Sequence, residues 1–219
     1  MGVVVETIAP GQLTGEVHIP ASKSHTIRAL LIASLAEGTS SLHSPLDSLD
    51  TAACVRACRA LGASVEEVRS EGQLTEITVE GTGGSLDTPE DVVDVGNSGT
   101  TLYLGMGTAA LSGGLTVFTG DEQIRRRSAA PLLEALSQLG ATAVSTRDNG
   151  CAPILVGGGL RPAHISLESP TSQYLSSLLL AAPLAHCGGD GAAAGATGEQ
   201  CETHIELLLL NERPYVEMT

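Results

Sequence analysis

The sequence contains no tryptophan, one phenylalanine and three tyrosines among its 219 residues. Aromatic side chains therefore cannot fill the interior, and a core must be built from the aliphatic residues of a chain that is 42% hydrophobic. This favours close-packed helices and aliphatic strands over an aromatic-rich β-sandwich. A chain of this length can bury a sizeable core as one large or two small domains.

Basic side chains are also scarce. The chain has 11 Lys and Arg against 25 Asp and Glu, which gives a net charge of −14. Because binding a polyanion requires a basic face, we expect no nucleic-acid partner. A small anionic ligand is still compatible, since a few well-placed cations can dominate a pocket. The single lysine, Lys23, is therefore informative.

Long apolar runs and a cysteine framework are missing as well. No uncharged apolar stretch reaches the roughly 18 to 20 residues that span a bilayer, and the opening MGVVVETIAPGQ lacks the features of a signal peptide. We therefore expect a cytoplasmic protein with no membrane association. The cysteines are odd in number and lack framework spacing, so we predict reduced thiols and no disulfides at Cys54, Cys58, Cys151, Cys187 and Cys201.

Three segments repeat one pattern, which starts with small hydroxyl residues and continues through a long apolar stretch. They cover residues 22–38, 98–114 and 171–185. A helix that is apolar nearly all round must be buried on every side. The three segments therefore predict three helices packed together in the middle of the fold.

The first two segments continue alike, with short β-like runs followed by amphipathic helices. These helices are expected at Asp50–Leu61, with Asp50 as N-cap, and at Ser128–Leu139, each ended by a glycine. Strands are expected next, at Leu74–Glu80 and Pro153–Val156. The repeated βαβαβ-like order predicts a compact α/β domain with internal pseudo-threefold repetition.

Each buried helix opens with hydrogen-bond donors. A helix N-terminus presents free N–H groups and the positive end of the macrodipole, so three converging starts would form an anion site. The simpler alternative is that these residues only cap their helices. The three starts are Ser22-Lys23-Ser24, Asn97-Ser98-Gly99-Thr100-Thr101 and Thr171-Ser172-Gln173.

Arg28 and a run of three consecutive arginines strengthen the anion-site hypothesis. Arg28 lies near the start of an otherwise apolar helix, where a charge is costly unless it meets an anion or stays at the rim. Arginine also suits bidentate recognition of phosphate or carboxylate. We expect one of Arg125, Arg126 and Arg127 to face the site and two to be solvated.

Five motifs in order resemble the 5-enolpyruvylshikimate-3-phosphate (EPSP) synthase family over essentially the whole chain. They are Pro20 to Arg28, Asn97-Ser-Gly-Thr, Thr119 to Asp121 with Arg127, Thr171-Ser-Gln, and Arg213 to Thr219. The resemblance implies an enolpyruvyl-transferase-like α/β domain of three βαβαββ-type repeats around buried parallel helices. It further implies that the chain is the N-terminal of two such domains and lacks the C-terminal one.

The resemblance also divides the chain. Residues 1–19 are expected to be a lead-in strand of the other domain, followed by repeats at 20–90, 91–160 and 161–219. The third repeat would carry an insertion at 186–210, which is rich in Gly and Ala and is expected to be a flexible loop or a diverged insertion. His186, Cys187, Cys201 and His204 within it match no common zinc spacing, so we predict no metal site. No G-x-G-x-x-G follows a strand, which argues against a dinucleotide, and no cofactor is expected.

The family's reaction transfers the enolpyruvyl group of phosphoenolpyruvate to the 5-hydroxyl of shikimate-3-phosphate. The resemblance implies that shikimate-3-phosphate contacts Lys23, Ser24, Arg28, Thr171, Ser172 and Gln173. Phosphoenolpyruvate would contact Gly99 and Arg127. Both ligands would contact Lys23 and Gln173. Thr100 would belong to the same binding set, and Tyr215 would lie along the shikimate ring. No catalytic residue is assigned, because the family's acid and base groups lie in the C-terminal half.

The chain departs from the family pattern at four positions. Tyr103 stands where the family usually has Arg, and Leu49 stands where an acidic pair is common. Thr171 replaces a Ser and keeps the hydroxyl. Glu212 stands where a Ser usually contacts the phosphate of shikimate-3-phosphate, and a carboxylate would repel that group, so this contact is not expected.

Two other functions compete with this interpretation. One is half of a related enolpyruvyl transferase that acts on a UDP-sugar; the Ser-Lys-Ser and Thr-Ser-Gln motifs favour shikimate phosphate instead. The other is a non-catalytic anion-binding module. We expect the chain alone to bind shikimate-3-phosphate weakly and to turn nothing over, with a complementing C-terminal half as a candidate partner.

Overall fold

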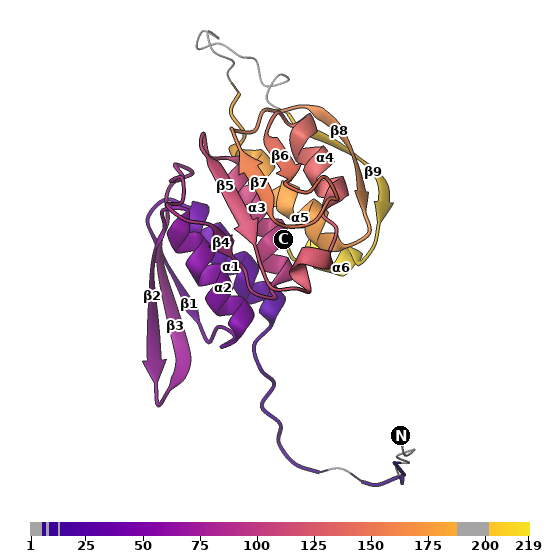
Figure 1. Cartoon of the computed structure of the whole chain (residues 1–219). Helices are drawn as coiled ribbons and strands as arrows, with labels where there is room; N and C mark the ends of the chain where they lie inside the picture. The colour runs from indigo at the N-terminus through magenta and orange to yellow at the C-terminus, as the bar shows by residue number, and fades with distance from the viewer. Residues whose placement is uncertain (1–5, 8, 13, 188–201) are drawn as a thin grey trace.

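Three helices lie in the middle of the molecule and three β-sheets lie outside them (Figure 1). The computed structural model describes residues 6, 7, 9–12, 14–187 and 202–219. The central helices are α1 (Lys23–Leu35), α3 (Gly99–Ala110) and α5 (Ser172–Ala181). They match the three apolar segments, so the predicted fold class of an α/β domain built around buried helices is confirmed.

Helix α3 packs against both α1 and α5, and all twelve of its residues are buried. Its small residues make the close approach to α5 possible. A Cβ on Gly107 would lie 2.7 Å from the carbonyl oxygen of Ser177 in α5. At the same crossing, Ser177 Oγ donates a 2.7 Å hydrogen bond to the carbonyl oxygen of Tyr103. The absence of a side chain at Gly107 therefore sets how closely the two helices lie.

The second repeat shows the β-α-β-α-β-β order in full. Strand β4 runs parallel to β5, and β7 is antiparallel to both β5 and β6, which gives the sheet order β4-β5-β7-β6. Helix α4 packs against β6 of this sheet and also contacts the central helices α3 and α5. The elements are β4 (Val93–Asp94), α3, β5 (Leu115–Thr119), η1 (Ile124–Arg126), α4 (Ala130–Gln138), β6 (Thr142–Ser145) and β7 (Ile154–Gly157).

The first repeat begins with α1 and has the antiparallel sheet order β1-β3-β2. Its elements are α1, β1 (Thr39–His43), α2 (Leu49–Ala60), β2 (Ser64–Ser70) and β3 (Gln73–Glu80). The predicted N-cap of α2 was wrong. Ser48, not Asp50, caps the helix by accepting a hydrogen bond from the Thr51 amide, and Asp50 lies in the first turn.

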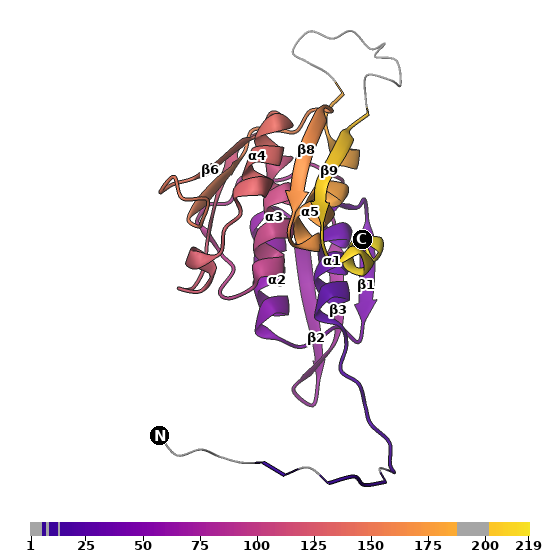
Figure 2. The same ribbon diagram turned by 90° about the vertical axis from the view of Figure 1, so that its right-hand side faces the viewer.

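In the third repeat the strands before and after α5 in the chain pair in parallel, as β4 and β5 do before and after α3. The elements of this repeat are β8 (His164–Ser169), α5, η2 (Ala182–Leu184), β9 (His204–Leu210) and α6 (Arg213–Glu217). Figure 2 shows β8 and β9 side by side. The flexible-loop alternative for 186–210 was wrong for residues 204–210, because they form β9 and pair with β8. Residues 188–201 of that predicted insertion, including Cys201, lie outside the described residues.

The described residues before Lys23 form no helix or strand, so the lead-in strand stays a prediction. In the part of the chain that the structure covers, no helix is long and apolar enough to cross a membrane. Cys54, Cys58, Cys151 and Cys187 are free thiols.

Candidate anion-binding site

The starts of α1, α3 and α5 meet around one hollow of about 240 Å³. Seven of the ten residues predicted to bind substrate line it, together with one residue that was not predicted to bind. The lining residues are Lys23, Ser24, Arg28, Thr100, Ser172, Gln173, Glu212 and Tyr215. The sequence prediction that three helix starts converge is therefore confirmed by the geometry, whereas the ligand of each residue stays a prediction.

Lys23 stands in the first turn of α1, whose N-terminus is capped by Ser22. Its Nζ lies 3.7 Å from Asp50 Oδ1 at the start of α2, and the Lys23 side chain is 48% exposed. A loose, half-exposed ion pair of this kind contributes little to stability. The ammonium group can therefore turn to an incoming anion at low cost.

Arg28 is the most unusual group of the site, because it is charged and only 3% exposed. Its guanidinium donates to Thr219 Oγ1 at 2.7 Å, Ser176 Oγ at 2.8 Å and the Tyr215 carbonyl oxygen at 3.1 Å. A further hydrogen bond goes to the Ser24 carbonyl oxygen. All four acceptors are neutral, and removal from water lowers the pKa of Arg28 below its usual value. A buried cation held only by neutral acceptors leaves its positive charge uncompensated.

Gln173 adds an unused acceptor to the wall of the hollow. Its Nε2 donates to Thr171 Oγ1 at 3.3 Å. Its Oε1 is buried and has no hydrogen-bond partner among the described residues. Because a buried polar atom without a partner is costly, this oxygen suits a hydroxyl group of a bound ligand. Thr171 itself does not line the hollow, although it is hydrogen-bonded to residues that do.

Glu212 occupies the start of α5. Its Oε2 accepts hydrogen bonds from Ser172 N at 3.1 Å, Ser172 Oγ at 3.0 Å and Thr171 Oγ1 at 3.2 Å. These bonds, above all the one from the Ser172 amide, lower the pKa of the Glu212 carboxyl group. From the sequence, Glu212 was expected only to repel phosphate. That it caps α5 from 40 positions away could not be predicted, because no local spacing signals such a contact.

Gly99 and Arg127 form a second part of the site, next to the hollow. A Cβ at Gly99 would lie 2.8 Å from Arg127 Nη1, so the glycine leaves the room that the guanidinium occupies. Arg127 Nη2 also donates to Asn97 Oδ1 at 3.3 Å. Its two neighbours turn elsewhere: Arg125 binds the Gly120 carbonyl oxygen and Arg126 pairs with Glu122.

Tyr103 and Tyr174 hold the chain just after Arg127. Both phenol groups donate to the carbonyl oxygen of Ser128, at 3.2 and 2.6 Å, and their rings meet edge to face at 5.0 Å. Burial is the largest cause that raises the pKa of each phenol. Tyr103 therefore supports the backbone of this segment and brings no charge to the site. Tyr174 was missed, since a tyrosine in an apolar helix gives no sequence signal of this contact.

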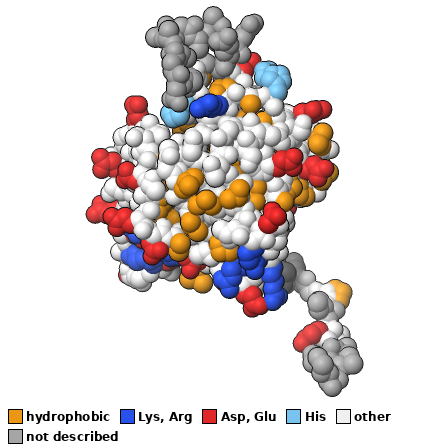
Figure 3. Space-filling view, turned by 45° about the horizontal axis from the view of Figure 1, so that its top comes forward, with side chains coloured by type: hydrophobic (Ala, Val, Ile, Leu, Met, Phe, Trp, Pro, Cys, Tyr) orange, Lys and Arg blue, Asp and Glu red, His pale blue; other side chains and the backbone are white. Residues whose placement is uncertain are grey.

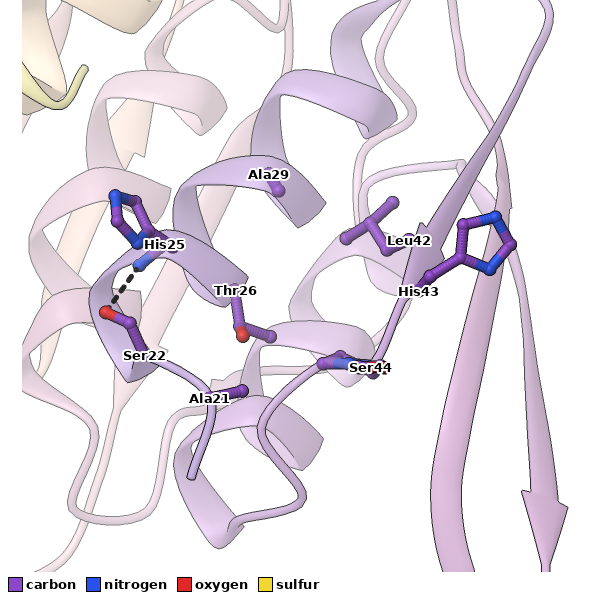
Figure 4. Close-up of a pocket in the computed structure, with 9 residues that line it drawn as sticks. Ala21, Ser22, His25, Thr26, Ala29, Leu42, His43 and Ser44 are labelled. Carbon is purple, nitrogen blue, oxygen red and sulfur yellow. Dashed lines mark hydrogen bonds between the residues drawn. The ribbon is translucent and has the colours of Figure 1, made fainter. Parts of the chain in front are cut away.

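Another hollow, of about 280 Å³, lies between α1 and β1. Figure 4 shows that its two imidazoles, on His25 and His43, lie at opposite sides and point apart. None of the described residues that line it is Lys or Arg. This hollow therefore lacks the convergent cations that the helix starts provide.

Charge is distributed unevenly over the surface. On the face in Figure 3 the acidic side chains are scattered around the periphery, whereas Lys and Arg gather in small groups. Over the residues that the structure places, no cluster of three or more His, Cys, Asp or Glu could hold a metal ion. Cations that are few but concentrated can make one pocket attractive to anions on an acidic protein.

Buried parallel helices whose starts line a hollow with Lys23 and Arg28 define an enolpyruvyl-transferase-like α/β domain. Residues 8–209 match the family model for EPSP synthase (3-phosphoshikimate 1-carboxyvinyltransferase), and the chain belongs to this family.

Relatives and solved structures agree with the family match. The 3-phosphoshikimate 1-carboxyvinyltransferase of Acetivibrio thermocellus is 49% identical over 97% of this chain and 46% of its own length. That of Methanothermobacter thermautotrophicus is 46% identical over 95% of this chain and 45% of its own length. A solved EPSP synthase from Acinetobacter baumannii superposes with a TM-score of 0.70 at 29% identity, covering 78% of this chain and 38% of that one. The chain spans about half the length of the curated relatives it matches.

Proposed function

We propose that this chain is the shikimate-3-phosphate-binding half of an EPSP synthase. The observation that carries the proposal is Arg28, a buried guanidinium whose four hydrogen bonds all go to neutral oxygens. A phosphate beside it would compensate the charge that the fold has buried. Lys23, on the same wall of the hollow, supplies a second cation.

The proposed ligand contacts follow from the positions of the side chains. The phosphate lies between Lys23, Arg28 and the start of α5, where Ser172 supplies an amide and a hydroxyl. Gln173 Oε1, which lacks a partner among the residues described, accepts from a ring hydroxyl. Tyr215 lines the hollow and is 46% exposed, so its ring is free to lie along the shikimate ring. Gly99 and Arg127 receive phosphoenolpyruvate.

The proposed overall reaction forms a bond between the 5-hydroxyl oxygen of shikimate-3-phosphate and C2 of phosphoenolpyruvate. The 5-hydroxyl group gives up its proton as its oxygen bonds to C2, and a proton adds to the methylene carbon to give a tetrahedral intermediate. The bond between C2 and the phosphate oxygen then breaks, phosphate leaves, and the methyl group loses a proton to restore the double bond. The cations described here would bind phosphate and carboxylate groups through these steps. The proton transfers require acid and base groups, which we assign to a complementing C-terminal half. A cytoplasmic location remains a prediction from the sequence.

Two alternatives predict different ligands. A half-enzyme that acts on a UDP-sugar would bind the uridine nucleotide in preference to shikimate-3-phosphate. A non-catalytic anion-binding module would bind phosphates without discriminating between their carriers. The unpartnered Gln173 Oε1 favours a ligand with a hydroxyl near its phosphate over a bare anion.

Calorimetric titration of the 219-residue chain with shikimate-3-phosphate, UDP-N-acetylglucosamine and inorganic phosphate tests this choice. We expect weak binding that is tightest for shikimate-3-phosphate. Lys23→Met should weaken it about 10- to 100-fold, because one charge-assisted contact is lost. The fold should survive, since the only ion pair of Lys23 among the described residues is loose. Lys23→Arg, which keeps the charge, is the matched control.

Activity is tested by adding the C-terminal half of the Acetivibrio thermocellus relative, meaning the part beyond the stretch that this chain matches. We expect phosphate release from phosphoenolpyruvate only when both halves and shikimate-3-phosphate are present. Lys23→Met should lower that rate. Failure of shikimate-3-phosphate to bind, or binding that Lys23→Met leaves unchanged, would contradict the proposal.

A further inference from the structure

The carboxylate of Glu212 takes three hydrogen bonds at the start of α5, and all three go to one oxygen, Oε2. The donors are two hydroxyl groups and one backbone amide, on Thr171 and Ser172. This donor set is typical of an anion site at a helix N-terminus. The place is therefore already filled by an anion that belongs to the chain.

The backbone brings Glu212 to this place in an uncommon conformation. Its φ of 57° and ψ of 40° lie in the left-handed region, which a residue other than glycine adopts at some cost. Asn211 next to it is fixed twice, since its amide donates to the Ser169 carbonyl oxygen and its Nδ2 donates to the Pro170 carbonyl oxygen. The segment before α5 and the segment before α6 are thus joined, and Glu212 is aimed at the helix start.

The positive groups of the hollow are not used by Glu212. Within the described ranges, Arg28 donates only to neutral oxygens, and the ion pair of Lys23 is with Asp50. The hollow therefore has two cations on one wall and a capped helix start on the other. A dianionic group that reaches both walls is attracted by Lys23 and Arg28 on the first wall. On the second wall it is repelled by the Glu212 carboxylate.

We infer that Glu212 is an internal competitor for the α5 start, which a phosphate-bearing ligand must displace before it can reach the Ser172 amide. This inference rests on the proposed function, since it concerns the same site. Displacement is feasible because Glu212 is exposed, so its side chain can turn into solvent. Glu212 thereby sets how tightly the site holds a phosphate, and it discriminates against ligands that cannot replace its three hydrogen bonds.

Titration of the chain and of two variants with shikimate-3-phosphate and with shikimate tests the inference. In Glu212→Ser and Glu212→Gln the competing charge is gone, so shikimate-3-phosphate should bind on the order of 10- to 100-fold more tightly. Shikimate, which has no phosphate, should change by less than about twofold. Glu217→Gln is the matched control, because it also removes one negative charge from an exposed side chain on α6 and should leave both affinities unchanged.

The Ser172 amide resonance gives a second readout that a purely structural role would not move. On addition of shikimate-3-phosphate this resonance should shift in the unmodified chain, because phosphate replaces the carboxylate. It should also shift in both variants, because phosphate then binds at a helix start that has no competing charge. Equal affinity of the unmodified chain and both variants, or binding without a shift at Ser172, overturns the inference and leaves the proposed function standing. Failure of every protein to bind shikimate-3-phosphate overturns both.

Discussion

Helices α3 and α5 lie against each other in the core, but their starts are stabilised in different ways. The start of α3 is satisfied locally by Ser98, whose Oγ accepts from the Thr101 amide at 3.3 Å and donates to Thr101 Oγ1 at 2.7 Å. Thr171, at the corresponding position of α5, does not cap its helix, because its side chain accepts no hydrogen bond from a backbone amide of α5. The amide of Ser172 is instead satisfied by Glu212, 40 positions along the chain.

The difference extends along the helix. Arg28 of α1 donates to Ser176 in the second turn of α5, and it also binds Thr219 and the Tyr215 carbonyl oxygen near α6. Helix α5 is therefore contacted by two charged side chains from other elements, Arg28 and Glu212. The hydrogen bonds of α3 with other elements are neutral, such as the one from Ser177 to the Tyr103 carbonyl oxygen, and apolar packing accompanies them. Both remote side chains line the hollow, so binding of a ligand and the stability of α5 should be coupled.

Arg28→Met should have the largest effect, because it removes the side chain that connects α1, α5 and the C-terminal segment. We expect a loss of about 1 to 3 kcal/mol in the free energy of unfolding, since several hydrogen bonds from a charged donor disappear. The loss is limited because Ser176 Oγ and Thr219 Oγ1 still bond to each other at 2.8 Å. Binding of shikimate-3-phosphate should fall by about 100-fold or more.

Urea denaturation and calorimetry measure the two effects of Arg28→Met separately. Arg28→Lys, which keeps the charge but cannot reach all four acceptors, is the control and should be intermediate in both measurements. Unchanged affinity in Arg28→Met would show that the buried charge does not serve a ligand, and the contrast between α3 and α5 would then concern stability alone.

Ser98→Ala tests the local cap of α3 and should cost about 1 kcal/mol, because it leaves a buried helix start without its acceptor. Ser22→Ala is the matched comparison on α1. Ser22 is exposed and its contact with the His25 amide is long, at 3.4 Å, so this change should cost less than about 0.5 kcal/mol. Thermal unfolding followed by circular dichroism ranks the two. A larger loss for Ser22→Ala would contradict the expected importance of burial.

The same contrast explains what the sequence could predict. The three central helices and the meeting of Lys23, Arg28 and Ser172 follow from apolar runs that begin with hydroxyl residues, which is local information. The role of Glu212 depends on a fold that brings residues 40 positions apart together, and no periodicity encodes it. Strand β9 was missed for a related reason: the run His204–Leu210 follows a Gly- and Ala-rich stretch, and it becomes a strand by pairing with β8.

Glu212→Gln should have the smallest effect on stability, and the effect should depend on pH. The hydrogen bonds from Ser172 and Thr171 lower the pKa of the Glu212 carboxyl group in the folded chain. A carboxyl group with a lowered folded pKa stabilises the fold above its unfolded pKa of about 4.3, and this contribution is lost as pH falls through the lower folded pKa. Because Glu212 is exposed and Gln can still accept hydrogen bonds, we expect a loss of about 0.5 kcal/mol or less in the free energy of unfolding at pH 7.

Urea denaturation at a series of pH values should show the stabilities of the unmodified chain and Glu212→Gln converging as the pH is lowered below about 4. Because the two proteins differ only at residue 212, the pH-dependent part of their difference can be assigned to this carboxyl group. A difference between the two proteins that stays constant down to acid pH would mean that the bonds to the α5 start do not depend on the charge of Glu212.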